Sequence, residues 1–235
     1  MAGRITRKEL KSDKFALEVE QTVDFVTKHR RELTIYGSIA AAVAVVAVGI
    51  YFYMGRQHMV RENALGEAIQ MQEAPVGPPS SGPRLSFPTE DAKRTAVTKA
   101  FGEIASGYPG SSEGAIAKYY LGSIAADQGK MPDAEKLFQE AASSGDKSYG
   151  PLARFSLAQT YFAQGRPADA EKILRDLMQH PSIFVSKEQA TIALARGIAP
   201  TKPDEARKLL EPLRTGGGAV SSAAMNAIGE LTGLQ

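Results

Sequence analysis

The chain has 235 residues, no cysteine and a formal net charge of +2. Without cysteine it has no disulfides, no thiolate metal ligands and no cysteine nucleophile. The weak positive charge excludes a strongly basic nucleic-acid surface, and no run of cations interleaved with aromatic residues occurs in the sequence.

Residues 1–32 form a basic head, with eight Lys or Arg against six Asp or Glu. Ser12 and Asp13 suit the N-cap of a helix, and the apolar residues after them recur at helical spacing. These apolar residues are Phe15, Val19, Val23 and Val26. The pattern predicts a short amphipathic helix. Its narrow apolar face lies on the membrane, pairs with another helix, or only stabilises a short juxtamembrane helix.

Residues 33–55 carry no charge and are almost entirely apolar. As a helix they reach about 34 Å, enough for a bilayer core of about 30 Å. We expect a single transmembrane helix. The alternatives are a cleaved signal peptide, whose apolar stretch is usually shorter, and a buried helix of a soluble domain, which is also usually shorter. Lys28, Arg30 and Arg31 precede the segment, and this bias predicts a cytoplasmic head and an exoplasmic C-terminal part.

Three further segments follow the apolar run. Residues 56–73 keep apolar residues at helical spacing, which predicts a helical extension. Residues 74–89 are rich in Pro, Gly and Ser, which predicts a loop. Residues 90–235 are helical in pattern throughout, because apolar and polar residues nowhere alternate long enough to indicate a strand.

A sequence repeat with a period of 36 residues organises this last segment. Residues 128–138 recur at 164–174, and a weaker third copy lies at 205–210. Such a period is typical of stacked helical hairpins, which need a terminal helix over the last apolar face. The expected elements are strong repeats at about 115–146 and 151–182, a weaker repeat at about 187–214 and a terminal helix at about 219–234.

The recurring residues resemble the tetratricopeptide repeat. Small residues fall where two helices approach, and large apolar residues fall between units. The repeat-defining residues are Leu121, Gly122, Gly129, Ala134, Phe138, Ala141, Leu157, Gly165, Ala170, Leu174 and Ala206. Lys118 and Arg154 depart from the family, which usually has an aromatic residue there. The resemblance implies a tetratricopeptide-like α-solenoid of helical hairpins, so that the whole chain is predicted to be all-α, with the N-terminal transmembrane helix followed by this solenoid.

The layout of residues 28–214 also resembles the translocon-ancillary (YfgM-like) proteins of the bacterial inner membrane. The likeness rests on the basic head, the span, the helical hairpin and the motifs at residues 101–105 and 117–122. It implies a single-pass protein of the inner (cytoplasmic) membrane, with a cytoplasmic N-terminus and a periplasmic repeat domain. It also implies exported proteins, chaperones or translocon subunits as partners.

Stacked helical hairpins form an extended concave surface lined by their first helices. The family's groove positions, projected onto this chain, are Tyr119, Ser123, Asp127, Phe155, Gln159 and Phe162. In such a groove the aromatic rings anchor apolar groups, and the polar side chains hold a peptide backbone. The alternative is that the three aromatic side chains simply pack between helices.

The sequence contains no pattern that indicates catalysis, a cofactor or a metal site. The histidines at 29, 58 and 180 lie far apart, without metal-ligand spacing. Gly216, Gly217 and Gly218 lack the following Lys-Ser or Lys-Thr of a phosphate loop and predict a turn. We therefore expect no enzyme, because no nucleophile, base and orienting group can be assembled.

The sequence supports two hypotheses for the function of the protein. The first is a protein-binding module on the exoplasmic, or periplasmic, face of the membrane. The second is a structural scaffold of an inner-membrane or cell-division envelope complex, in which residues 14–32 and 56–73 pair with copies of themselves or with other subunits. A homo-oligomer formed through the small residues Gly37, Ala41 and Ala42 of the span belongs to this second hypothesis.

Overall fold

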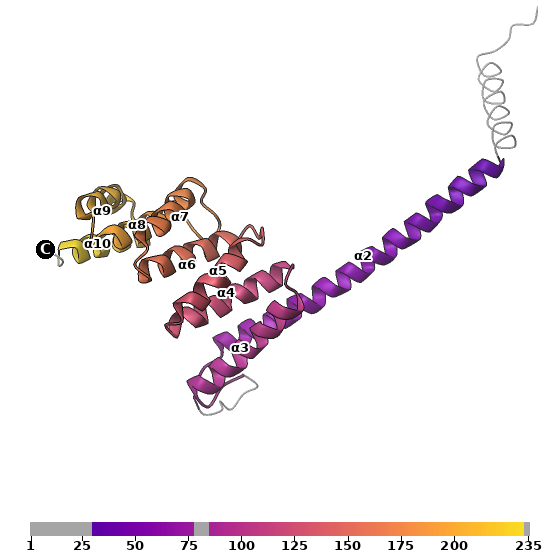
Figure 1. Cartoon of the computed structure of the whole chain (residues 1–235), viewed down its shortest axis with the longest axis horizontal. Helices are drawn as coiled ribbons and strands as arrows, with labels where there is room; N and C mark the ends of the chain where they lie inside the picture. Colours follow the sequence, from indigo (N-terminus) through magenta and orange to yellow (C-terminus); the bar gives the residue numbers. More distant parts are fainter. Residues whose placement is uncertain (1–29, 78–84, 233–235) are drawn as a thin grey trace, which may run out of the picture. The chain divides into compact units, whose positions relative to one another are not determined.

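The computed structural model describes residues 30–77 and 85–232 (Figure 1). These residues form nine α-helices and one short 3-10 helix, and they contain no β-strand. The helices are α2 (Arg30–Glu73), α3 (Glu90–Gly107), α4 (Ser112–Asp127), α5 (Met131–Ala142), α6 (Tyr149–Ala163), α7 (Pro167–Gln179), α8 (Lys187–Ile198), α9 (Pro203–Leu210), η1 (Glu211–Thr215) and α10 (Gly218–Thr232). The predicted all-α fold class is confirmed, whereas the amphipathic helix predicted in the head lies outside the described residues.

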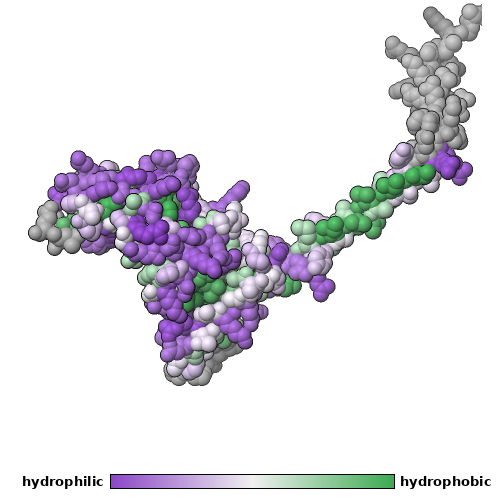
Figure 2. Space-filling model, viewed as in Figure 1, coloured by the Kyte–Doolittle hydropathy of each residue, from purple (hydrophilic) through white to green (hydrophobic). Residues whose placement is uncertain are grey.

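The first part of α2 is long and apolar enough to cross a membrane, as Figure 2 shows by its green run of side chains. Every side chain from Thr34 to Arg56 is exposed in the chain as described. A core helix of a soluble domain would bury one face instead. The predicted membrane helix therefore lies inside α2, which continues without a break through the predicted extension at 56–73.

The chain divides into two compact units within α2, between Met59 and Val60. In the second unit, Leu65 and Ala68 of α2 pack in one apolar cluster with Val97 and Phe101 of α3. Arg61 of α2 also lies 3.6 Å from Glu113 in the first turn of α4, where the helix dipole favours a carboxylate. The end of α2 is thus part of the folded repeat domain.

A closed loop joins α2 to α3. The backbone N–H of Gly77 donates to the carbonyl of Phe87 at 2.9 Å, and the N–H of Phe87 donates to the carbonyl of Pro75 at 3.1 Å. The hydroxyl of Thr89 then accepts from the N–H of Ala92 and caps α3. The Pro-, Gly- and Ser-rich segment, of which residues 78–84 are not described, therefore connects two packed helices of the domain.

The remaining helices form hairpins α4/α5, α6/α7 and α8/α9. Gly129 and Gly165 adopt φ of +72° and +73° at the first two turns, a conformation that strains residues with a Cβ. Ala134, Ala170 and Ala206 each have 0% exposure, so a larger side chain at these positions would separate the paired helices.

Large apolar side chains fill the space between the hairpins. Phe138, Leu174 and Leu210 occur 36 residues apart and are almost completely buried. A Cβ at Gly122 would lie 2.8 Å from the ring of Phe138, which explains why this position lacks a side chain. Helix α10 packs against α8 and α9, and its Ala224, Ala227 and Leu231 close the core at the end of the stack.

Ion pairs follow the same period as the core. Lys118 pairs with Glu140 at 2.8 Å, and Arg154 pairs with Asp176 at 2.5 Å, each between the first and the second helix of one hairpin. These cations stand where the tetratricopeptide family usually has an aromatic residue. The chain thus joins its paired helices here by charge instead of by an aromatic side chain.

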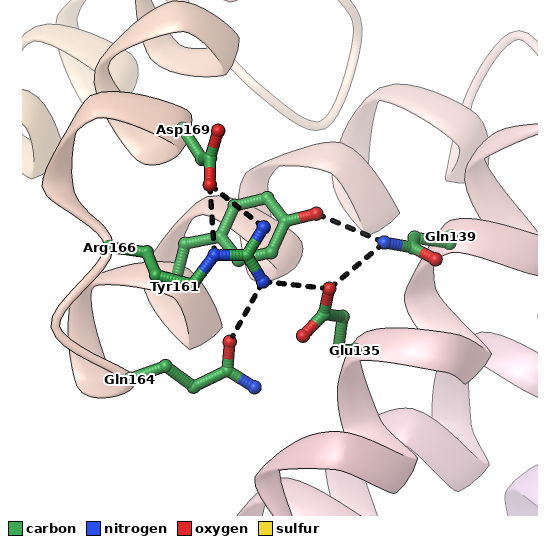
Figure 3. Close-up of polar contacts among 6 residues, drawn as sticks. All are labelled: Glu135, Gln139, Tyr161, Gln164, Arg166 and Asp169. Carbon is green, nitrogen blue, oxygen red and sulfur yellow. Dashed lines mark hydrogen bonds and ion pairs between the residues drawn. The ribbon is translucent and has the colours of Figure 1, made fainter.

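A second set of pairs joins consecutive hairpins. Arg166 precedes α7 and donates to Glu135 of α5 at 2.9 Å, while Lys202 precedes α9 and donates to Glu171 of α7 at 2.7 Å. In the first pair the guanidinium also covers the ring of Tyr161 at 4.1 Å and bonds to Asp169 (Figure 3). Each of these two cations therefore ties the second helix of one hairpin to the second helix of the preceding hairpin.

Candidate protein-binding groove

The first helices of the hairpins carry all six side chains of the predicted groove. Helix α6 contacts α4 on one side and α8 on the other. Tyr119, Ser123 and Asp127 lie on α4, four residues apart, and Phe155, Gln159 and Phe162 lie three or four residues apart on α6. This spacing places each set on one side of its helix.

A hollow of about 340 Å³ lies between α4 and α6. Its walls include Tyr119, Ser123 and Asp127 from α4 and Gln159 from α6. Met131, at the start of α5, and Ser156 of α6 also face this space. Four of the six predicted residues are thus brought to one concavity.

A second hollow, of about 590 Å³, lies between α6 and α8. Phe155, Gln159 and Phe162 form its α6 side. Because Gln159 borders both hollows, they adjoin across this one side chain. Both volumes fall in the range of about 300–1,000 Å³ that ligand sites usually occupy.

The sequence reasoning missed the far side of the second hollow. These residues are Gln189, Ile192, Ala193 and Arg196 of α8 and Ala223 of α10. The four α8 residues follow the i, i+3, i+4, i+7 spacing of one helix face, which was the available signal. The repeat is too weak in this region for groove positions to be projected onto it.

The aromatic side chains of the predicted groove line the hollows and also pack against the core. Tyr119 is half-buried, and its ring lies 5.5 Å from that of Tyr149 and 5.9 Å from that of Phe138. Phe162 packs on Gly197, where an added Cβ would lie 2.1 Å from its ring. The two alternatives for these residues, groove or packing between helices, are therefore not exclusive.

Charge is scarce in both hollows. Asp127 and Arg196 are the charged residues among the described side chains that line them. Arg196 is neutralised by Glu230 of α10, which accepts two hydrogen bonds from its guanidinium, both of 3.1 Å. The remaining polar groups are amides and hydroxyls, so the groove offers hydrogen bonds and apolar surface.

Tyr119 of the groove belongs to a cluster of aromatic side chains with Tyr120, Tyr149 and Phe101. Tyr120 stacks on Phe101 at 4.7 Å, and its ring lies 5.6 Å from that of Tyr119. Burial, followed by a hydrogen bond with Tyr149, raises the pKa of Tyr120. The phenol therefore stays neutral and acts as a packing and hydrogen-bonding group.

The other predicted residues lie outside the groove. Arg30 and Arg31 are exposed in the first turn of α2, and Lys28 falls outside the described residues. Over residues 30–77 and 85–232, no cluster of three or more His, Cys, Asp or Glu is placed to hold a metal ion. The site is thus a polar and aromatic concavity built from repeated helices.

Comparison with known families identifies the fold. Residues 28–191 match the family described as the tetratricopeptide repeat-like domain. The chain belongs to this family. Neither the curated proteins nor the solved structures compared with the chain gave a match. The matched residues begin before the apolar run and end within α8. Repeats of this kind typically serve as scaffolds for protein–protein interaction.

Proposed function

We propose that the protein is a membrane-tethered protein-binding module whose groove lies on α4, α6 and α8. One observation carries this proposal: Gln159 borders two adjoining hollows that bring together the six groove residues projected from the repeat. A single pocket would suit a small molecule, whereas adjoining concavities along consecutive helices suit an extended polypeptide.

The proposed compartment follows from the charge around the apolar part of α2. Lys28, Arg30 and Arg31 precede that segment, and the positive-inside rule assigns this side to the cytoplasm. In a bacterium with two membranes, the groove would then face the periplasm. The resemblance to translocon-ancillary (YfgM-like) proteins extends the proposal to exported chains, chaperones or translocon subunits as partners.

Site-specific photocrosslinking of the full-length protein in its native membrane tests the groove. The photoreactive residue replaces Gln159, which is exposed and borders both hollows; the matched control replaces Gln179, which is exposed on α7. We expect the Gln159 position to capture exported proteins, chaperones or translocon subunits and the Gln179 position to capture few of them. Capture of one membrane complex equally from both positions would instead favour the envelope scaffold.

The orientation has a separate test that uses the absence of cysteine. Ser12→Cys places a single thiol in the head, and Ser222→Cys places one on the exposed surface of α10. A membrane-impermeant maleimide should label the Ser222→Cys protein in intact spheroplasts and the Ser12→Cys protein only after lysis. The reverse pattern would place the groove in the cytoplasm.

A further inference from the structure

We infer that the groove takes an extended, uncharged stretch of polypeptide with apolar side chains, and not a charged peptide or a free carboxylate terminus. This inference rests on the proposed function and adds the chemistry of the ligand. Its basis is the composition of the walls. The α4, α6 and α8 surfaces present Phe155, Phe162 and Ile192 together with neutral amides and hydroxyls.

Charge complementarity excludes the other peptide classes. A carboxylate needs a cation or several free donors, but Arg196 is already paired with Glu230, so an incoming carboxylate would also meet the negative charge of Glu230. A basic peptide would find a single carboxylate, Asp127, in the first hollow, and Lys93 of α3 lines a neighbouring hollow that the same residue borders. A charged side chain would therefore lose water in this groove, with Asp127 as the one partner for a cation and Arg196, already paired with Glu230, as the one partner for an anion.

Gln159 is placed to hold the backbone of such a ligand. Its amide offers two donors and an acceptor, it is exposed, and it borders both hollows. Gln189 faces it from α8; its side-chain oxygen accepts from the N–H of Ser186 at 2.8 Å, which leaves its NH₂ group for a ligand. Amides recognise a peptide backbone whatever its sequence, so the apolar walls determine which side chains are accepted.

The size of the stack sets the length of the ligand. Neighbouring packed helices lie about 8–10 Å apart, and an extended chain advances about 3.3 Å per residue. Crossing from α4 to α8 then takes about six residues. Alternate side chains point the same way, so about three of them face the groove.

Fluorescence anisotropy with the full-length protein in lipid nanodiscs tests the inference. The probe is a labelled peptide of alternating leucine and serine, about ten residues long, with acetylated and amidated ends. Its partners carry aspartate or lysine in place of a central leucine. Empty nanodiscs correct for binding to lipid. We expect the leucine peptide to bind about tenfold more tightly than either charged peptide, because a central charge would lose its water in a groove whose walls are mostly apolar or neutral.

Two further measurements locate and characterise the binding. Gln159→Glu should weaken the leucine peptide about tenfold, while Gln179→Glu on α7 should leave its affinity within about twofold. Between about 50 and about 500 mM NaCl the affinity should not fall, since salt screens only charged contacts.

The possible failures are distinguishable. Tighter binding of a charged peptide, lost with increasing salt and altered by Gln159→Glu, would overturn the ligand class and leave the groove in place. Binding of no peptide, or binding that neither Gln159→Glu nor Phe155→Ala changes, would overturn both this inference and the groove.

Discussion

The first two hairpins and the last one share a period but differ in how they are held. In α4/α5 and α6/α7, Lys118–Glu140 and Arg154–Asp176 join the paired helices at equivalent positions. In α8/α9 the equivalent positions are Ala190 and Pro212, and no such pair is possible. The hairpin turn differs as well, because Thr201 stands where the earlier turns have glycine.

The pairs between hairpins show the same boundary. Glu135 and Glu171 each receive a cation from the next unit, whereas the third equivalent position is Arg207, which is exposed. Arg207 carries the same charge as the cations that Glu135 and Glu171 bind, so it cannot form the equivalent pair. The ion-pairing residues therefore repeat every 36 residues where one hairpin packs on the next, whereas the last hairpin, which α10 covers, lacks them at positions 190, 207 and 212.

The largest expected difference between the inner hairpins and the last one lies in the core. Leu174 and Leu210 are equivalent and both have 0% exposure. We expect Leu174→Ala to reduce the free energy of unfolding by about 4 kcal/mol and Leu210→Ala by about 2.5 kcal/mol, because a cavity at the end of the stack can collapse more readily. Urea titration followed by far-UV circular dichroism of the full-length protein measures both. Equal losses would show that the last hairpin is as constrained as the inner ones.

The hairpin turns give an intermediate effect, because the first two turns favour glycine and the third favours threonine. Gly129→Ala and Gly165→Ala should each cost about 1 kcal/mol, because both positions need positive φ. Thr201→Gly should also destabilise, by about 0.5–1 kcal/mol. No described non-glycine residue has positive φ, so Thr201 does not need the freedom of glycine, and the substitution only increases the conformational entropy of the unfolded chain. The same urea titrations report these changes. A stabilising Thr201→Gly would show that the third turn is strained after all.

The ion pair between α6 and α7 gives the smallest effect. Both partners are partly exposed, so a double-mutant cycle of Arg154→Ala and Asp176→Ala should give a coupling energy of about 0.5 kcal/mol. The hydrogen bond from Arg154 is the main cause that lowers the pKa of Asp176, against the effect of burial. A coupling energy of zero would contradict a stabilising role for this pair.

The lowered pKa of Asp176 determines how the stabilisation by the Arg154–Asp176 pair depends on pH. Because the pKa of Asp176 is lower in the folded protein, its stabilisation is complete above the unfolded value of about 3.9. It is lost as the pH falls through the lower folded value. Stability measured from pH about 5 downward should therefore decline less steeply in Arg154→Ala than in the unchanged protein, and identical slopes would contradict the assignment.

The sequence predicted much of the fold because helices and repeats leave local signals. The 36-residue period located the Ala134 and Ala170 contacts, the glycine turns and the large residues between units. The period also contained the ion pairs, since Lys118 and Glu140 recur as Arg154 and Asp176 at the same separation. Sequence alone identifies Lys118 and Arg154 only as departures from the family pattern, because each partner lies 22 residues away and no local rule links the two.

The groove was less accessible from the sequence. Projection placed Tyr119, Ser123, Asp127, Phe155, Gln159 and Phe162 on neighbouring helices, and their part in binding stays a prediction. The α8 wall could not be projected, because α8 is paired with the weak third copy. The joining of two hollows at Gln159 depends on how α4, α6 and α8 pack together, which is a property of the tertiary structure.

The pairing of α2 with α3 has a practical consequence for preparing a soluble fragment. The Pro-rich segment at 74–89 resembles a domain boundary, and a soluble fragment could be designed to begin there. Such a fragment would lack Arg61, Leu65 and Ala68. The apolar side chains of Val97 and Phe101, both with 0% exposure, would then face water and favour aggregation. A fragment that begins near Arg56 keeps this surface covered and omits the apolar run. The N-terminal cut of a well-behaved fragment therefore belongs within the long helix, ahead of Arg61.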